Sequence, residues 1–208
     1  MARTTKPLLA LCALLGACGP LVDLGGQSGP PARIYEVSAA GQASIASLET
    51  PAIILVEEPF ASSVLDSDRI AVTLSGGEIQ FLSGARWSDR PTRMARRVLQ
   101  DTLGSVDGLT ALGRGGLDIP SEYRLKVQLR DFHVDNRSGT ARTAVSVQAW
   151  LVETGGDLVA TQSFSAASDL PIVDSANAVS GVQSDLSDVA RALTQWVADT
   201  LESQSKDT

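Results

Sequence analysis

Near its middle the chain reads Arg69-Ile-Ala-Val-Thr-Leu-Ser-Gly-Gly-Glu-Ile-Gln-Phe-Leu-Ser-Gly-Ala-Arg-Trp-Ser-Asp-Arg-Pro-Thr-Arg-Met94, and it continues without a break to Leu103. Two apolar runs, Ile70–Leu74 and Ile79–Leu82, flank a Ser-Gly-Gly sequence at 75–77. Paired glycines readily adopt the positive φ that tight turns require. The segment therefore predicts a β-hairpin.

An amphipathic helix is predicted directly after the hairpin, over Pro91–Leu103. Its apolar and polar residues separate onto two faces at helical spacing, namely Met94, Val98, Leu99 and Leu103 against Arg93, Arg96, Arg97 and Asp101. Proline is tolerated in a first helical turn, and Asp89 suits the positive end of the helix dipole. Either Ser88 or Asp89 could be the cap.

Three sequential antiparallel strands are predicted further along. Apolar residues alternate with polar ones over Tyr123–Leu129 and again over Val145–Leu151, and Leu158, Ala160 and Phe164 line part of a third strand. The alternation changes phase at Asp131, which predicts a β-bulge there. Turns are expected at 136–139 and 154–157.

The remaining segments of the folded part carry weaker patterns. Ile53–Val56 is a short apolar run typical of a central strand, and Pro59 ends it because proline cannot donate to a ladder. Ile34–Val37 is a weak strand. Loops are expected over 39–50 and 112–120.

The second helix is the most regular element. An apolar stripe recurs at steps of three and four residues, while several polar residues lie off it: Val179, Val182, Leu186, Val189, Leu193 and Trp196 against Asp185, Asp188, Arg191 and Gln195. A coiled coil is one interpretation, but the pattern lasts for less than three heptads. A helix over Val179–Leu201 packed on a sheet is favoured, followed by a fraying polar tail over 202–208.

These elements predict an α+β fold. A mostly antiparallel sheet of five to seven strands would carry both amphipathic helices on one face. The other face, with Arg124, Lys126, Gln128 and Arg130, would be solvated or would meet a partner.

The first 17 residues are typical of a secretory signal. Arg3 and Lys6 precede a short apolar core over Leu8–Leu15, which is far shorter than the roughly 20 residues that span a bilayer. The sequence Leu15-Gly-Ala-Cys18 resembles a bacterial lipobox, so Cys18 is the predicted lipid-attachment residue. An ordinary cleavable signal with an incidental cysteine is the alternative. Cys12 would leave with the signal, so the mature chain could form no internal disulfide.

A flexible tether is expected over 18–32, since glycine and proline are frequent there. One folded domain would then occupy 33–201. The whole chain carries 17 basic and 24 acidic residues, and loss of Arg3 and Lys6 leaves a net charge of −9. Such an acidic domain has no electrostatic footprint for nucleic acid and is repelled by anionic headgroups.

Candidate chemical sites are few. His133 is the single histidine and lacks the partners that a transition-metal site needs, so a structural or exposed role is favoured over a general base. Asp66 and Asp68 could suggest a cation site, but a turn is favoured because Asp and Ser bond to their own backbone. No serine-hydrolase elbow, phosphate loop or zinc motif is present, and we predict no catalytic residue, metal or cofactor.

Three pieces of sequence, in this order, resemble the ABC-type transport auxiliary lipoproteins. They are Ile53-Ile-Leu-Val-Glu-Glu-Pro59 with Leu65-Asp-Ser-Asp-Arg-Ile70, the hairpin with Ala85-Arg-Trp-Ser-Asp-Arg-Pro91, and Tyr123-Arg-Leu-Lys-Val-Gln-Leu-Arg-Asp-Phe132. The resemblance runs from about residue 34 to about residue 201. The chain departs from the family at Glu36 and Val37, where the opening strand is expected to be richer in leucine and proline.

The resemblance implies a non-enzymatic partner of an ABC transporter and of a mammalian-cell-entry type substrate-binding protein, which together move lipid across the periplasm. A docking adaptor anchored at the outer membrane through Cys18 and facing the periplasm is expected, and a homo-oligomeric ring is one form it could take. Gly19 in place of a retention aspartate favours the outer membrane by analogy with enteric sorting. The alternatives are a structural or regulatory envelope lipoprotein, for cell-wall synthesis or outer-membrane integrity, and an anchored hydrolase that uses His133 or Asp66 and Asp68.

Overall fold

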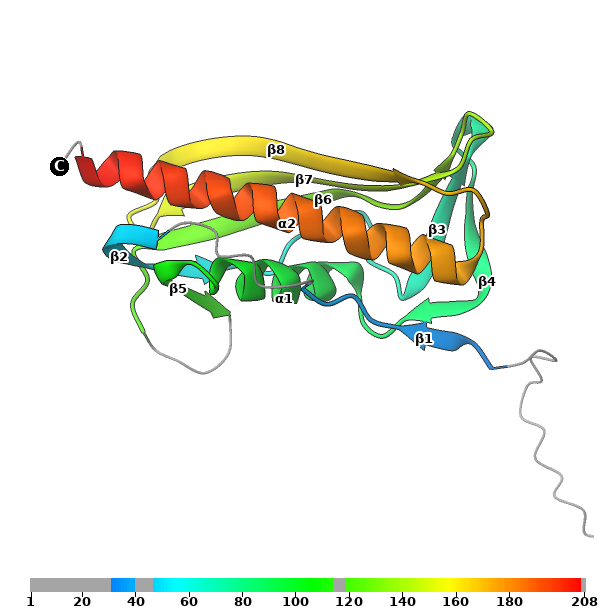
Figure 1. Ribbon diagram of the computed structural model, residues 1–208, viewed down its shortest axis with the longest axis horizontal. Helices are drawn as coiled ribbons and strands as arrows, with labels where there is room; N and C mark the ends of the chain where they lie inside the picture. Colours follow the sequence, from blue (N-terminus) through cyan, green and yellow to red (C-terminus); the bar gives the residue numbers. More distant parts are fainter. Residues whose placement is uncertain (1–30, 40–46, 114–118, 207–208) are drawn as a thin grey trace, which may run out of the picture. The chain divides into compact units, whose positions relative to one another are not determined.

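The structure is a computed structural model that describes residues 31–39, 47–113 and 119–206. These residues form an eight-stranded sheet and two α-helices (Figure 1). The elements, in chain order, are β1 Arg33–Tyr35, β2 Ser47–Val56, β3 Arg69–Leu74, β4 Ile79–Trp87, α1 Pro91–Leu103, β5 Asp107–Gly113, β6 Tyr123–Asn136, β7 Arg142–Glu153, β8 Leu158–Asp169 and α2 Ser175–Lys206.

The predicted hairpin and first helix are confirmed. β3 and β4 pair antiparallel, and a short 3₁₀ turn over Ser75–Gly77 joins them. Gly76 and Gly77 have φ values of 73° and 82°, which a residue with a Cβ adopts only at a cost. The turn therefore needs this glycine pair.

The N-terminus of α1 differs from the expected cap. Arg90 is the N-cap residue and makes no side-chain capping bond. Asp89 lies one residue earlier, where its carboxylate accepts from the Arg90 backbone N–H at 2.8 Å and forms ion pairs with Arg93 and Arg97. Both Ser88 and Asp89 are thus excluded as the cap, although Asp89 still places negative charge at the positive end of the helix.

The three sequential antiparallel strands are also confirmed. β6 pairs with β7, and β7 with β8, over almost their whole lengths. The register of β6 against β7 shifts between Leu129 and Asp131, so the predicted bulge lies where the alternation changes phase. Arg130 is the extra residue.

The sheet as a whole is mixed, so the prediction of a mostly antiparallel sheet is only partly right. β6 pairs parallel with β3 through its C-terminal part and parallel with β2 through its N-terminal part. The pairs β1–β4 and β2–β5 are parallel as well. Parallel neighbours need long crossover connections, and these leave no local turn signal in the sequence.

Two expected loops contain strand. The described part of the 39–50 loop includes the start of β2 at Ser47, and the described part of the 112–120 loop includes the end of β5 at Gly113. β5 is short, and three of its seven residues are exposed, so its weak pattern gave no strand signal. The second helix extends beyond Val179–Leu201 at both ends, and the described part of the predicted fraying tail is helical up to Lys206.

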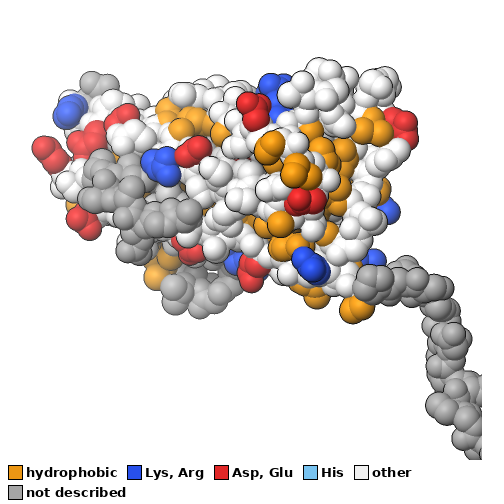
Figure 2. All heavy atoms as spheres, turned by 45° about the vertical axis from the view of Figure 1, so that its right-hand side comes forward, with side chains coloured by type: hydrophobic (Ala, Val, Ile, Leu, Met, Phe, Trp, Pro, Cys, Tyr) orange, Lys and Arg blue, Asp and Glu red, His pale blue; other side chains and the backbone are white. Residues whose placement is uncertain are grey.

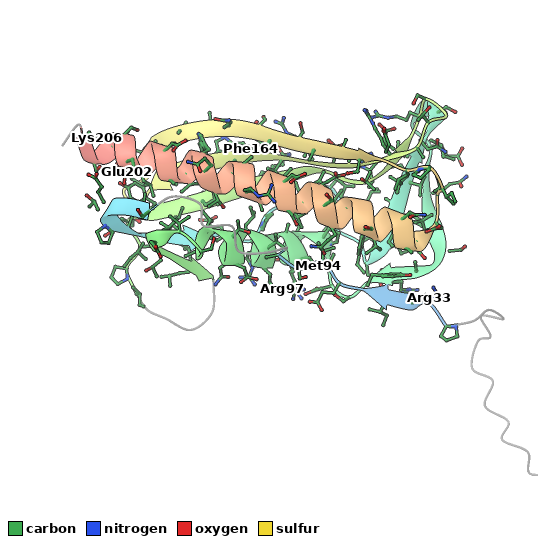
Figure 3. All side chains as sticks on the ribbon, viewed as in Figure 1. Arg33, Met94, Arg97, Phe164, Glu202 and Lys206 are labelled. Atoms are coloured by element: carbon green, nitrogen blue, oxygen red, sulfur yellow. The ribbon has the colours of Figure 1, made fainter. Side chains whose placement is uncertain are left out.

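Both helices cover the same face of the sheet, as predicted (Figure 1). α2 packs on β7, β8, β2 and α1, and α1 packs on β5 and β2. The α2 stripe residues Val182, Leu186, Val189 and Leu193 are almost fully buried, together with Met94, Val98, Leu99 and Leu103 of α1. Phe164 of β8 meets Trp196 of α2 edge to face at 5.7 Å (Figure 3). The helix-on-sheet interpretation therefore holds for this segment within the described chain.

One polar residue of α2 points into this interface. Asp185, which the sequence placed on the solvent side of α2, is only 1% exposed. Its two carboxylate oxygens accept hydrogen bonds from the Thr143 hydroxyl at 2.5 Å and from the Ser168 hydroxyl at 2.6 Å. Burial raises the pKa of the Asp185 carboxyl, and the two hydroxyl donors partly offset this effect.

Gly181 lets α2 approach β7 closely beside this carboxylate. A Cβ at this position would lie 2.6 Å from Thr143 Oγ1 and 2.7 Å from its Cγ2. We expect Gly181→Ala to lower the free energy of unfolding by about 1–3 kcal/mol, because added atoms in a packed interface force backbone shifts. Urea denaturation of the folded domain measures this change.

Ser180→Ala is the matched control, since Ser180 is the exposed neighbour of Gly181 on the same helix. It should change the unfolding free energy by no more than about 0.5 kcal/mol. Equal stability of the Gly181→Ala and Ser180→Ala variants would contradict the close-packing role of Gly181.

Candidate functional site

The predicted anchor lies outside the described residues. Cys18, the signal over 1–17 and the tether up to residue 30 all precede Pro31, where the described chain begins. Neither helix of the described chain is long and apolar enough to cross a bilayer. Membrane attachment through Cys18 therefore stays a prediction from the sequence.

Asp66 and Asp68 lie in the predicted turn, at 63–68. Asp66 accepts a hydrogen bond from the Thr92 hydroxyl at 2.6 Å, which links this turn to the first turn of α1. Asp68 forms an ion pair with Arg86 of β4 at 2.9 Å. The two carboxylates thus serve different neighbours, and no group of three or more metal-binding side chains occurs within the described ranges.

His133 lies on β6 just after the bulge and is 7% exposed. Neither ring nitrogen has a hydrogen-bond partner, and the nearest carboxylate oxygen, on Asp131, is 3.8 Å from Nδ1. Burial lowers the pKa of the imidazole, although the carboxylates of Asp131 and Asp135 act in the opposite direction. The ring is therefore held neutral, in a structural position.

A serine and a carboxylate lie beside this histidine, but in an order that does not activate a nucleophile. The Ser146 hydroxyl donates to Asp131, and Asp131 stands between Ser146 and His133. Nucleophilic catalysis by serine requires the hydroxyl to bond to the base, with the carboxylate behind that base. The geometry supports a structural network across the bulge.

A second carboxylate cluster closes the turn between β6 and β7. Asp135 is buried and accepts hydrogen bonds from Arg137 at 2.8 and 2.9 Å and from Arg142 at 3.4 Å. These bonds, those from Arg137 above all, hold the pKa of the Asp135 carboxyl far below its usual range. Sequence reasoning missed this cluster, whose only local signal is the Asp-x-Arg spacing at the turn.

The predicted polar face of the sheet remains free of helices. We call it the open face and define it by Arg124, Lys126, Gln128 and Arg130 of β6, Trp150 of β7, and Phe60. Register places Lys126 directly opposite Trp150 and Gln128 opposite Gln148. Phe60 joins this surface because its backbone pairs with β6 beside Gln128.

Two aromatic rings stack across β6 on the open face. Phe60 and Trp150 have ring centroids 6.1 Å apart and planes only 17° from parallel, and Phe60 is 55% exposed. Arg124 lies 3.9 Å from Glu57, whereas Lys126 and Arg130 form no ion pair among the described residues. Exposed aromatic rings beside arginine are typical of protein contact surfaces. The sequence predicted the cationic row but not the aromatic pair, whose members are 90 residues apart in the sequence.

Known structures share this fold. A crystal structure of a protein from Xanthomonas campestris, described as a member of DUF330, superposes with a TM-score of 0.77 at 24% identity, covering 84% of this chain and 99% of that one. A second crystal structure, of an uncharacterized protein, gives a TM-score of 0.64 at 14% identity and covers 81% and 99% of the two chains. At these identities the similarity shows the fold alone. No curated protein matches the chain at a significant level.

The sequence itself places the chain in a family. Residues 35–194 match the family described as ABC-type transport auxiliary lipoprotein component, which is not a known enzyme family. The match spans the domain from β1 into α2, and the three pieces that carried the resemblance, within 53–70, 85–91 and 123–132, all lie inside it. The chain therefore belongs to the ABC-type transport auxiliary lipoprotein family.

Proposed function

We propose that this protein is a lipid-anchored envelope subunit that serves an ABC transporter and a mammalian-cell-entry type substrate-binding protein in lipid transport. The family match over 35–194 carries this proposal. The lipobox-like sequence that ends at Cys18 supports attachment to a membrane, and Gly19 favours the outer membrane with the domain facing the periplasm.

We further propose that the protein acts through its surfaces and not through catalysis. Two of the carboxylates in the domain already serve the fold: Asp185 joins α2 to the sheet, and Asp66 joins a turn to α1. The open face differs from these sites, because its aromatic rings and its cations Lys126 and Arg130 do not join one element of the fold to another through a hydrogen bond or an ion pair among the described residues. It is the surface that we assign to the substrate-binding protein, which would present an acidic patch.

Removal of the anchor cysteine should release the protein from the membrane. Each buried methylene of an acyl chain contributes about 0.8 kcal/mol, so two or three chains hold a protein firmly. We expect Cys18→Ala to move the protein from the membrane fraction to the soluble fraction after cell fractionation. Cys12→Ala, which changes the other cysteine in the same leader, should leave the protein in the membrane fraction. A native mass that shows no diacylglycerol on Cys18 would contradict the anchor.

Truncation of the aromatic stack should weaken partner binding. Tryptophan and arginine dominate the energetics of many interfaces, and a central residue often contributes about 2 kcal/mol or more, which is roughly a 30-fold change in affinity. We expect Trp150→Ala and Lys126→Glu to reduce co-purification of the substrate-binding protein from native membranes to this extent.

Lys206→Glu is the matched control for charge, since Lys206 lies in the last turn of α2, on the helix that covers the other face of the sheet (Figure 3). Recovery of the transporter components with Trp150→Ala at the wild-type level would remove the open face from the proposal. Failure to recover any component with the wild-type protein would favour a structural or regulatory envelope lipoprotein.

Protonation of His133 should make the stability of the domain depend on pH. Replacement of His133 should not affect transport. Its pKa is lowered in the folded state, so between about pH 6.5 and the folded-state pKa the unfolded chain binds a proton that the folded chain does not. Stability should therefore fall as the pH drops below about 6.5, by at most about 1.4 kcal/mol per pH unit. His133→Asn should remove this slope, which urea unfolding at several pH values measures.

His133 is the single histidine of the chain, so no other side chain has an ordinary pKa near 6.5, where the loss of stability should begin. The raised pKa of Asp185 acts with the opposite sign, because its folded state binds the extra proton. An unchanged slope in His133→Asn would overturn the assignment. Loss of transport at neutral pH in a stably folded His133→Asn protein would revive a catalytic role.

A further inference from the structure

Exposed apolar side chains gather at one end of the domain. Among the described residues, seven large hydrophobic side chains are exposed, and four of them belong to this end: Ile34 at 72%, Ile172 at 63%, Ile79 at 42% and Val173 at 40%. We call this the β1 end and define it by β1, the hairpin of β3 and β4, the turn from β6 to β7, and the connection from β8 to α2. Figure 2 shows hydrophobic side chains spread over this part of the surface.

The β1 end is held together by hydrogen bonds and by a small core of its own. The Tyr35 hydroxyl lies 3.1 Å from the Ser175 hydroxyl, which ties β1 to the start of α2. The Leu170 N–H donates to the Ala141 carbonyl at 2.8 Å and ties the end of β8 to the turn before β7. A separate apolar cluster fills the space beneath and comprises Val72, Val134, Ala141, Leu170 and Ala178. The segments that carry the exposed isoleucines are therefore held in place by these hydrogen bonds and by this apolar packing.

The charge of this end differs from that of the rest of the domain. Residues 31–208 carry 15 basic and 23 acidic residues, a net charge of −8. Counted over residues 33–35, 68–87, 135–142 and 169–174, the β1 end has five arginines and five carboxylates and is neutral: Arg33, Arg69, Arg86, Arg137 and Arg142 against Asp68, Glu78, Asp135, Asp169 and Asp174. All of the net negative charge thus lies elsewhere, so an anionic surface repels the rest of the domain but not this end.

The chain also reaches this end from its anchor. Twelve residues separate Cys18 from Pro31, and β1 begins two residues later at Arg33. Even a fully extended chain spans only about 3.3–3.6 Å per residue, so these residues reach at most about 45 Å. Acyl chains on Cys18 would therefore keep the β1 end at a high effective concentration beside the bilayer.

We propose that the β1 end is a membrane-contacting surface, with Ile34, Ile172 and Val173 seated among the lipid headgroups and Arg33 beside their phosphates. The proposal rests on the anchor at Cys18 from the proposed function. Apolar side chains beside basic ones bind the interface of an anionic bilayer. This contact would orient the domain, with the open face roughly perpendicular to the membrane plane. The C-terminal end of α2 would point away from the bilayer.

The chain itself permits a direct test. Cys12 leaves with the signal and Cys18 is blocked by its lipid, so a cysteine introduced into the domain would be the single free thiol of the acylated protein. Ile34→Cys and Ile172→Cys are labelled with an environment-sensitive fluorophore, and each protein is reconstituted into vesicles of phosphatidylethanolamine, phosphatidylglycerol and cardiolipin. We expect blue-shifted emission and a several-fold lower rate of quenching by aqueous iodide at both positions.

Leu158→Cys is the matched control, since Leu158 is an aliphatic residue with 59% exposure at the start of β8, at the other end of the domain. Its label should be quenched as readily in vesicles as in detergent. Adding Ile34→Asp to Ile172→Cys should restore quenching at position 172, because a carboxylate on the same end of the domain opposes insertion of that end into the bilayer. Equal quenching at positions 34, 158 and 172 in vesicles would overturn the proposal.

Other occupants of the β1 end give different results. If the labels at 34 and 172 are protected in the unacylated Cys18→Ser protein without vesicles, a second copy covers the end and the proposal fails. The vesicles contain no transporter component, so the result is independent of partner binding. Acylation of Cys18 is scored separately by mass, which separates failure of the anchor from failure of the contact.

Discussion

The structure depends on the burial of one side of α2 against the sheet. α2 crosses β7 and β8, touches β2, and packs on α1, so one helix joins the three long antiparallel strands to the rest of the domain. Gly181 allows α2 to approach β7 closely. The Asp185 carboxylate fixes the position of α2 on the sheet, because hydroxyls from two different strands must both reach its oxygens. Replacing either group disturbs the seating of the helix and not only one contact.

The same packing decides which surfaces remain available. Because both helices cover one face, Phe60, Lys126 and Arg130 of the other face remain exposed to solvent, and Phe60 stacks on the half-buried Trp150. Because the excess of acidic over basic residues lies outside the β1 end, the charge of the domain is uneven along its length. Under the proposed function the domain contacts a partner protein and a membrane at once, and the open face and the β1 end are the separate surfaces that we propose for these two contacts.

Local chemistry explains which elements could be predicted. The glycine pair at 76 and 77 required a tight turn, Pro91 marked the first turn of α1, and the phase change at Asp131 located the bulge. Each of these sequence signals reflects the conformation of only a few neighbouring residues. The parallel partners of β6 and the existence of β5 depend on pairings between distant segments, so no short pattern revealed them. The burial of Asp185 was missed for a related reason: its position in the helical pattern is polar, and only the hydroxyls of Thr143 and Ser168 make its burial tolerable.

The sequence by itself determined the α+β class, the two amphipathic helices, the hairpin, the antiparallel strands from 123 onward and the family, because all of these follow from periodicity, turn residues and ordered motifs. It also carried the prediction of an anchor at Cys18. Only the tertiary structure decided that the sheet is mixed, that Phe60 meets Trp150, that His133 is buried without a hydrogen-bond partner among the described residues, and that exposed isoleucines share one neutral end. The physical reason is that hydrogen bonds and side-chain contacts between segments far apart in the chain are set by packing, which the order of residues does not display.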